Sequence, residues 1–520
     1  VKRIEDVVTL RARQFREDQG PLAHPVRPDS FVEINNFYTA TVYEKGAEVI
    51  GMLKKLVGET GYEAALKLYF NRHDGQAATI EDWLMVFEEA TGRNLSQFKR
   101  WYEQAGTPRV AVQEAWDGRG TYTLTLTQTN PPTPGQPDKD PKLIPVALGL
   151  LNPNGDEVLP TAILELDQPV QTFRFEGLAA RPIPSILRGF SAPVVLDHDQ
   201  TPETRAFLLA HDTDPFNRWE AGRALAKEVL ARMATQGAAA STLWLEALTR
   251  LVLDEGQDAA FRALCLRLPS EDDMAATLAA SGVVPDPDRI HTARRQMAQA
   301  LAERLAPSLP TLIASLQPRG PFSPDAVQAG RRALTGGLLA LQTRLDGGTA
   351  ARAAFAAADN MTDSLAALVA LLEIGAGADA LSAFETRWHA DRLVMDKWFM
   401  VQALHAPPER LAETVTRLAA RPDFDWLNPN RFRALIGALS ANHAGFHRAD
   451  GSGYRLLADW LIRLDTRNPQ TAARMSTGFE TWRRYDADRQ QLIRQELERI
   501  LATPGLSRDL TEMASRMRGV

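Results

Sequence analysis

Two of the nine histidines in the sequence have a spacing that suits metal chemistry. His443 and His447 stand four positions apart, which places two imidazoles on one face of a helix. A zinc hydrolase of the H-E-x-x-H type also needs a glutamate directly after the first histidine, to activate water. Ala444 occupies that position, Gly445 interrupts the segment, and no third ligand is evident. The pattern favours a helix end with two solvent-exposed histidines, and we assign no metal ligand in this chain.

Other self-contained catalytic motifs are absent from the sequence. It contains neither a Walker-type phosphate loop nor a Gly-x-Ser-x-Gly nucleophile elbow. The single cysteine, Cys265, lies in an apolar stretch and is predicted to be a small buried thiol rather than a nucleophile. One cysteine cannot form an intrachain disulfide, which is compatible with a reducing compartment.

The densest group of polar side chains lies in residues 35–49. Two tyrosines, Tyr38 and Tyr43, stand there with two carboxylates and a lysine, just before and within the start of an amphipathic helix. Polar groups therefore gather where that helix could meet a cleft. From residue types alone, Tyr43 is most simply a buried tyrosine with a satisfied hydroxyl, and a chemical role stays open.

The elements that would carry these residues are helical from residue 1 to about 106. Apolar residues recur at helical spacing in 43–57, which Gly58 closes, and again in 62–70. Thr79 is predicted to cap a third helix, and a fourth precedes the stop at 106–108.

After residue 108 the period of the apolar pattern changes from 3.6 to 2. Residues 121–127 alternate threonine with apolar side chains, which predicts a half-buried strand. Further strands are predicted at 143–151 and 172–175. Short strands at this spacing predict a small β-sandwich.

From about residue 200 to residue 520 the strand signals vanish, and alanine, leucine and arginine dominate. Proline and glycine interrupt this region at intervals that suit helix pairs, although no strict repeat is found. The predicted fold class is therefore multidomain and mainly α, with a small β-sandwich followed by an α-solenoid of helical hairpins.

Composition narrows the possible partners. The net charge of -6 argues against a basic surface for nucleic acid. No run of 18 apolar residues occurs, and the first twenty residues alternate charged and apolar groups, so we expect neither a membrane span nor a signal peptide. Because the sequence begins with Val1 rather than methionine, we expect either processing or the back part of a longer protein.

Several segments together resemble bacterial aminopeptidase N, a family of zinc-dependent aminopeptidases of the gluzincin type. The likeness runs in order along the whole chain. It is carried by Tyr-Glu-Lys-Gly-Ala at 43–47 and by residues 23–28, 72–75, 98–108, 359–363, 394–399 and 428–431.

The resemblance implies a domain organisation. Residues 1–106 would be the C-terminal helices of a thermolysin-like catalytic domain, 107–193 the β-sandwich, and 194–520 the helical domain that covers the active site. In this family the H-E-x-x-H helix and the later glutamate of the zinc site come earlier in the protein. Zinc is therefore expected as cofactor of the full-length enzyme, with none bound by this chain alone.

The resemblance also implies roles for individual residues. Tyr43 matches the catalytic tyrosine whose hydroxyl donates to the oxyanion as the scissile carbonyl is attacked. Tyr38 and Glu44 match positions that line the pocket around the scissile bond, and Asn35 lies nearby, so all three are expected to bind substrate. Gln470 and Arg474, one helical turn apart, resemble residues that face an internal cavity and could contact a peptide's backbone or carboxylate.

The predicted function is therefore that of the C-terminal portion of a cytoplasmic zinc aminopeptidase, with peptides as substrates and the missing N-terminal catalytic portion as partner. The isolated chain is expected to be inactive. A noncatalytic helical-repeat scaffold that binds peptides or proteins is the alternative. A third possibility is a chain that works in trans with a separately made N-terminal half.

Overall fold

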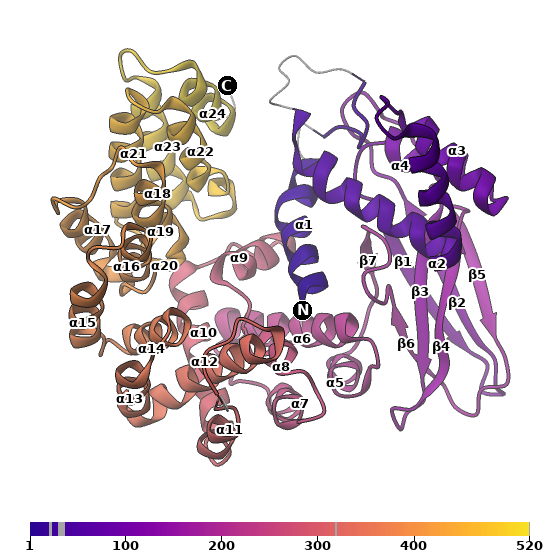
Figure 1. The fold of residues 1–520 in the computed structure, drawn as a ribbon, viewed down its shortest axis with the longest axis horizontal. Coiled ribbons are helices and arrows are strands. Elements are labelled where there is room, and N and C mark those ends of the chain that lie inside the picture. Colours follow the sequence, from indigo (N-terminus) through magenta and orange to yellow (C-terminus); the bar gives the residue numbers. More distant parts are fainter. Residues whose placement is uncertain (20–22, 30–36, 318–319, 519–520) are drawn as a thin grey trace. The chain divides into compact units, whose positions relative to one another are not determined.

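The computed structural model describes residues 1–19, 23–29, 37–317 and 320–518. These residues form two compact units, Val1–Gly222 and Arg223–Val520, here called the first and the second unit. Figure 1 labels their helices and strands.

The first unit begins with the helices that carry the polar segment around Tyr43. Helix α2 contains both helices predicted from the sequence and has one non-helical residue between them, Gly58 (φ 72°, ψ 170°). Thr79 caps α3 as predicted, because its hydroxyl accepts the N–H of Asp82 at 3.1 Å. The helical elements here are α1 (Lys2–Asp18), a π-helical turn (Thr41–Lys45, here called the π-turn), α2 (Gly46–His73), α3 (Ile80–Thr91) and α4 (Arg100–Glu103).

Two sheets follow α4 and form the β part of the first unit. One has the strand order β5-β2-β1-β7 and the other β4-β3-β6. The β1–β7 pair is parallel, and the other pairs are antiparallel. The strands are β1 (Arg109–Trp116), β2 (Tyr122–Thr129), β3 (Ile144–Leu151), β4 (Glu157–Leu166), β5 (Val170–Phe175), β6 (Ile183–Ile186) and β7 (Val195–Asp197).

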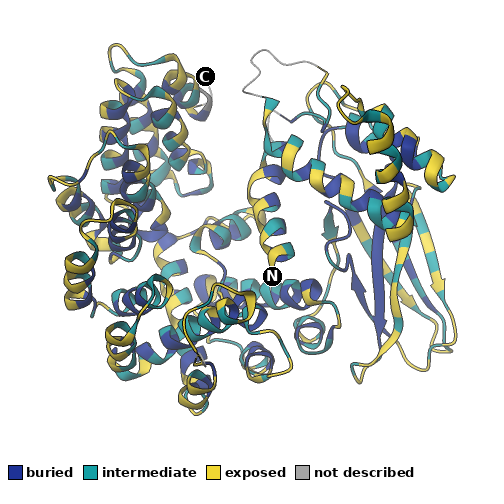
Figure 2. Cartoon of the chain, in the orientation of Figure 1, coloured by how far each residue is buried: buried dark blue, intermediate teal, exposed yellow. Residues whose placement is uncertain are grey.

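The burial of these strands follows from their sequence patterns. On β2, Tyr122, Leu124 and Leu126 are buried and alternate with threonines that are less buried, as the period of 2 predicts. Every residue of β3 is buried, because β3 lies between β4 and β6 and carries apolar side chains on both faces. Figure 2 shows β3 in dark blue throughout. The helix α5 (Pro202–His211) then leads to α6 (Pro215–Gln236), which contains the boundary between the units.

The second unit is helical throughout the part that the structure describes. Its longest helices are α10 and α12, and its core includes the aromatic pair Trp398 and Phe399 on α16, both buried. Its α-helices after α6 are α7 (Thr242–Leu253), α8 (Ala259–Cys265), α9 (Glu271–Ala280), α10 (Pro287–Leu305), α11 (Leu309–Ser315), α12 (Ala326–Asp346), α13 (Thr349–Ala357), α14 (Met361–Glu373), α15 (Ala378–Trp388), α16 (Arg392–Leu404), α17 (Leu411–Ala419), α18 (Pro429–Phe432), α19 (Ala438–Ala441), α20 (His443–Phe446), α21 (Ser452–Asp465), α22 (Pro469–Met475), α23 (Ala487–Leu501) and α24 (Arg508–Arg518).

The predicted fold class is confirmed. Helical elements precede the sheets, and helices alone follow them through the described residues. Cys265, predicted to be buried, is only half-buried at the end of α8.

Candidate functional site

The candidate site lies on the π-turn that leads into α2. In a π-helix the carbonyl of one residue accepts from the amide five positions later, so the turn is wider than an α-helical one, and such turns are frequent at functional sites. Thr41 and Lys45, at its two ends, are buried, whereas Tyr43 between them is 59% exposed. The interpretation of Tyr43 as a buried tyrosine is therefore wrong. Its phenol is free to meet a ligand.

Tyr38 lies beside Tyr43. The two ring centroids are 6.2 Å apart with an interplanar angle of 33°, and Tyr38 is 60% exposed. Aromatic rings at this separation attract each other. The structure thus brings two of the predicted site residues together as an exposed pair of phenols.

Glu44 is turned toward α1. Its Oε1 lies 3.6 Å from Nη1 of Arg13, and its side chain is 28% exposed. The carboxylate is therefore only partly committed to an ion pair. Asn35, the remaining predicted residue of this group, lies outside the described residues.

Side chains from the C-terminal part of α1 support the π-turn. Gln14 donates to the Thr41 hydroxyl, and Glu17 accepts the Thr41 N–H at 3.0 Å. Burial alone would raise the pKa of Glu17, but His24 and Thr41 hold that pKa at about 2. The same contact with Glu17 raises the pKa of His24. An anionic Glu17 is thus available as an acceptor for the π-turn at neutral pH.

Sequence reasoning missed these supporting residues. Asp18 and Lys45 form a buried ion pair, with Oδ2 and Nζ 2.8 Å apart. A lysine at the foot of an amphipathic helix is ordinarily a solvated residue, so only the proximity of α1 in the fold reveals its partner. The signal available in the sequence was the Glu17-Asp18 pair at the end of an otherwise amphipathic helix.

Gln470 and Arg474 belong to the second unit. They lie on α22, whose N-cap Asn468 accepts the N–H of Thr471, and both are exposed. Their spacing of one helical turn is as predicted, and both side chains are open to a ligand. Tyr43 belongs to the first unit.

The prediction of two solvent-exposed histidines at 443 and 447 is wrong, because both are buried. Nε2 of His443 is 2.9 Å from the Tyr485 hydroxyl, and Nδ1 of His447 is 2.9 Å from the Tyr454 hydroxyl. Burial lowers the pKa of both histidines, that of His447 strongly. They are neutral members of a packed hydrogen-bonded cluster.

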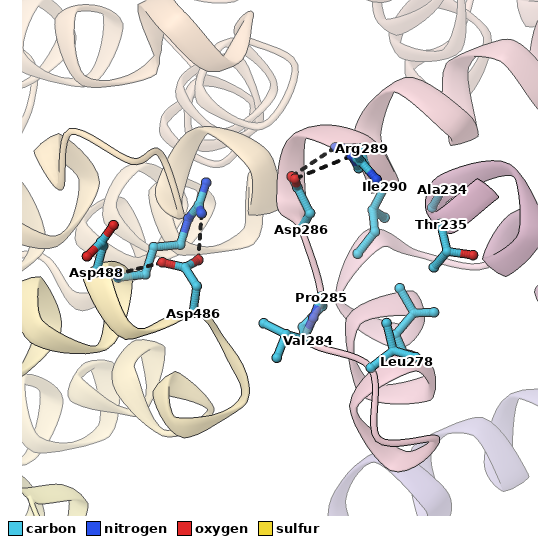
Figure 3. A pocket seen from close by; sticks show the side chains of 12 residues that line it. Ala234, Thr235, Leu278, Val284, Pro285, Asp286, Arg289, Ile290, Asp486 and Asp488 are labelled. Carbon is cyan, nitrogen blue, oxygen red and sulfur yellow. Dashed lines mark hydrogen bonds and ion pairs between the residues drawn. The ribbon is translucent and has the colours of Figure 1, made fainter. Parts of the chain in front are cut away.

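The second unit also contains a cavity of about 560 Å³, shown in Figure 3. Charged side chains line it, and several of them already have hydrogen-bond or ion-pair partners. Asp286 accepts the backbone N–H groups that begin α10, and Asp486 pairs with Arg489 at 2.7 Å. None of the predicted site residues lines this cavity.

The described residues contain no group of three or more histidine, cysteine, aspartate or glutamate side chains that could hold a metal ion. Among the helices of residues 1–19, 23–29, 37–317 and 320–518, none combines the length and apolar character needed to cross a lipid bilayer.

Known protein families match three consecutive parts of the chain. Residues 202–519 match the family model described as a domain of unknown function (DUF3458_C) with ARM repeats. Residues 106–199 match a domain of unknown function (DUF3458) with an Ig-like fold. Residues 3–102 match the peptidase family M1 domain, and these residues include the π-turn.

Whole-chain similarity points the same way. Aminopeptidase N of Caulobacter vibrioides is 46% identical over 100% of this chain and 61% of its own length. Aminopeptidase N of Escherichia coli is 38% identical over 99% of this chain and 61% of its own length. Among solved structures, aminopeptidase A of Legionella pneumophila in complex with aspartic acid matches with a TM-score of 0.82 and 29% identity, over 99% of this chain and 62% of that one.

The chain thus spans about 61% of the length of these curated relatives. Its family model covers more than half of its residues. The chain belongs to the DUF3458_C family, and the resemblance to bacterial aminopeptidase N predicted from its sequence is confirmed.

Proposed function

We propose that this chain is the C-terminal portion of a zinc-dependent aminopeptidase that removes N-terminal residues from peptides. The observation that carries the proposal is the exposed phenol of Tyr43 on the π-turn, within the segment that matches the peptidase family M1 domain. In this proposal residues 1–106 complete the catalytic domain, 107–193 form the β-sandwich and 194–520 form the helical domain that covers the active site.

The described residues do not supply a zinc site, so we assign zinc to a portion of the full-length protein outside them. Tyr43 has a task of its own. When water adds to the scissile carbonyl, negative charge develops on the carbonyl oxygen, and a hydroxyl fixed beside it can donate a hydrogen bond that strengthens in the transition state. No proton needs to leave the phenol for this role.

The other site residues are proposed to bind the peptide. Tyr38 offers an exposed ring next to Tyr43, and Glu44 offers a carboxylate that is only loosely paired with Arg13. Asn35 is proposed to lie near them. Gln470 and Arg474 are proposed to contact the backbone or the carboxylate of the peptide, since both are exposed on one face of α22.

The test is the Tyr43→Phe variant of the full-length enzyme. Removing one oxyanion donor costs about 10²–10³ in kcat. We expect a loss of that size, with KM within about threefold, because the phenyl ring and its packing are kept. Tyr69→Phe is the matched control, because Tyr69 lies on α2, the helix that follows the π-turn, and packs against Trp83. A Tyr43→Phe enzyme as fast as the wild type would refute the proposal.

A further inference from the structure

The π-turn is hydrogen-bonded at both ends to the C-terminal part of α1. At its start, Gln14 Nε2 donates to Thr41 Oγ1 at 3.3 Å and Glu17 Oε1 accepts the Thr41 N–H at 3.0 Å. At its end, Lys45 Nζ donates to Asp18 Oδ2 at 2.8 Å. Tyr43 lies between the two attachments and carries none of them itself.

The Asp18–Lys45 pair is sealed from solvent. The side chains are 0% and 1% exposed. Asp18 also accepts from the Thr107 hydroxyl at 2.9 Å and from the Gly106 N–H at 3.3 Å, while Lys45 donates to the Gly106 carbonyl at 2.8 Å. Buried charges are tolerated only when paired and hydrogen-bonded, so this pair favours a single arrangement of the π-turn.

Gly106 allows the backbone to reach both charges. Its φ is +87°, and a Cβ there would lie 3.0 Å from Thr133 Cγ2 and 3.1 Å from Lys139 Nζ. A side chain at this position would be strained as well as crowded. The junction between α4 and β1 therefore closes over the ion pair and joins the start of the sandwich to the π-turn.

We infer that Asp18 and Lys45 are positioning residues, whose buried ion pair fixes the π-turn and so the direction in which Tyr43 presents its hydroxyl. Neither side chain can reach a ligand, because both are fully covered. The consequence for turnover rests on the proposed function of Tyr43. A misplacement of about 1 Å at a reacting centre can cost 10²-fold in rate.

The kinetic test uses Asp18→Asn and Lys45→Met in the full-length enzyme. Each leaves one charge buried without its partner. We expect kcat to fall about 100-fold with KM within about threefold. The double variant has no buried charge at this place, and it is expected to lose no more than the worse single variant, since the two residues act as one unit.

A structural readout separates positioning from the chemistry. With 3-fluorotyrosine at position 43 of the full-length protein, both single variants are expected to shift or broaden the ¹⁹F resonance. Glu48→Gln is the matched control. Glu48 accepts from Arg3 at 2.5 and 2.6 Å and so also joins α2 to α1, but it lies beyond the π-turn. This variant is expected to leave the resonance unchanged.

An unchanged resonance in Asp18→Asn and Lys45→Met would overturn the inference. A resonance that changes in these variants, together with a fully active Tyr43→Phe enzyme, would support the positioning role and refute the proposed function. If either charge variant fails to fold, Thr107→Val removes a single donor to Asp18 and leaves the pair intact. It is expected to shift the resonance by a smaller amount, and no shift there would count against the inference.

Discussion

Lys142 is an ionisable residue that the fold buries away from solvent. Its side chain is fully buried, its Nζ is 3.0 Å from Oε1 of Gln104, and it lies 5.7 Å from the centre of the Trp101 ring. Burial, helped by the nearby ammonium groups of Lys45 and Lys139, lowers the pKa of Lys142 to about 6. The amine is therefore neutral in the folded protein at pH 7.

This predicts a pH-dependent stability that the Lys142→Met variant lacks. Between pH 6 and the ordinary lysine pKa of 10.5, the unfolded chain binds a proton at residue 142 that the folded chain does not. The free energy of unfolding of the wild type should therefore rise with pH, relative to the variant, by about 1.4 kcal/mol per pH unit. Urea unfolding of both proteins at pH 7, 8 and 9 measures the difference.

The control for that experiment is Lys67→Met, because Lys67 lies exposed on α2. Its unfolding free energy should run parallel to that of the wild type across the pH range. Parallel curves for the wild type and Lys142→Met would show instead that the buried amine keeps its proton.

For single residues of the site, the local sequence pattern predicted spacing but not burial. The resemblance singled out Tyr43, but residue types alone suggested a buried tyrosine, whereas Tyr43 lies exposed on the π-turn. The spacing of His443 and His447 was read correctly and their exposure wrongly. Both histidines pack against Tyr485, which lies 42 residues after His443 in the sequence, so a local pattern could not predict their burial.

At the scale of elements, periodicity predicted the secondary structure of segments whose fold depends on their own local sequence. The alternation along β2 and the apolar run of β3 both gave strands, and the Thr79 cap gave the start of α3. The predicted end of a helix at Gly58 became a break inside α2, because its φ of 72° interrupts the helix while the chain then resumes it. Strand order and the parallel β1–β7 pair depend on distant segments and could not be read from a local pattern.

The approach of α21 to α20 depends on one glycine. A Cβ at Gly453 would lie 2.5 Å from the carbonyl oxygen of Phe446 and 2.8 Å from its Cα, both backbone atoms that no rotamer change can move. The next residue, Tyr454, then reaches His447 with its hydroxyl. The close contact thus sets the buried histidine cluster as well as the packing of two helices.

The Gly453→Ala variant is therefore expected to lower the free energy of unfolding of the second unit by about 1–3 kcal/mol, the usual cost of overpacking. Gly337→Ala on α12 is the control, since its Cβ would make an ordinary 3.6 Å contact with Leu266. Alanine in a helix interior should stabilise that site by about 0.5–1 kcal/mol. Urea unfolding followed by far-ultraviolet circular dichroism measures both. A Gly453→Ala protein as stable as the wild type would contradict this prediction, because it would show that α20 can move away from α21 without loss of stability.

At the scale of the whole molecule, the described residues hold Tyr43 in place but contain no cluster of metal ligands. The exposed Tyr43 is held by buried contacts, whereas the described residues supply no cluster of metal ligands. None of the nine histidines is followed by glutamate in the sequence. The proposed function therefore requires that the metal ligands come from a stretch of the full-length protein other than the one that carries Tyr43.

The isolated 520-residue chain should therefore not hydrolyse an N-terminal amino-acid arylamide, even with added zinc. The full-length protein serves as the positive control, and its activity should disappear with a chelator and return with zinc. If the chain is produced together with a separate segment that contains the H-E-x-x-H helix, turnover should reappear and should again require Tyr43. Robust turnover by the purified chain alone would mean that its own residues perform the hydrolysis, and the division of labour proposed for Tyr43 would be wrong.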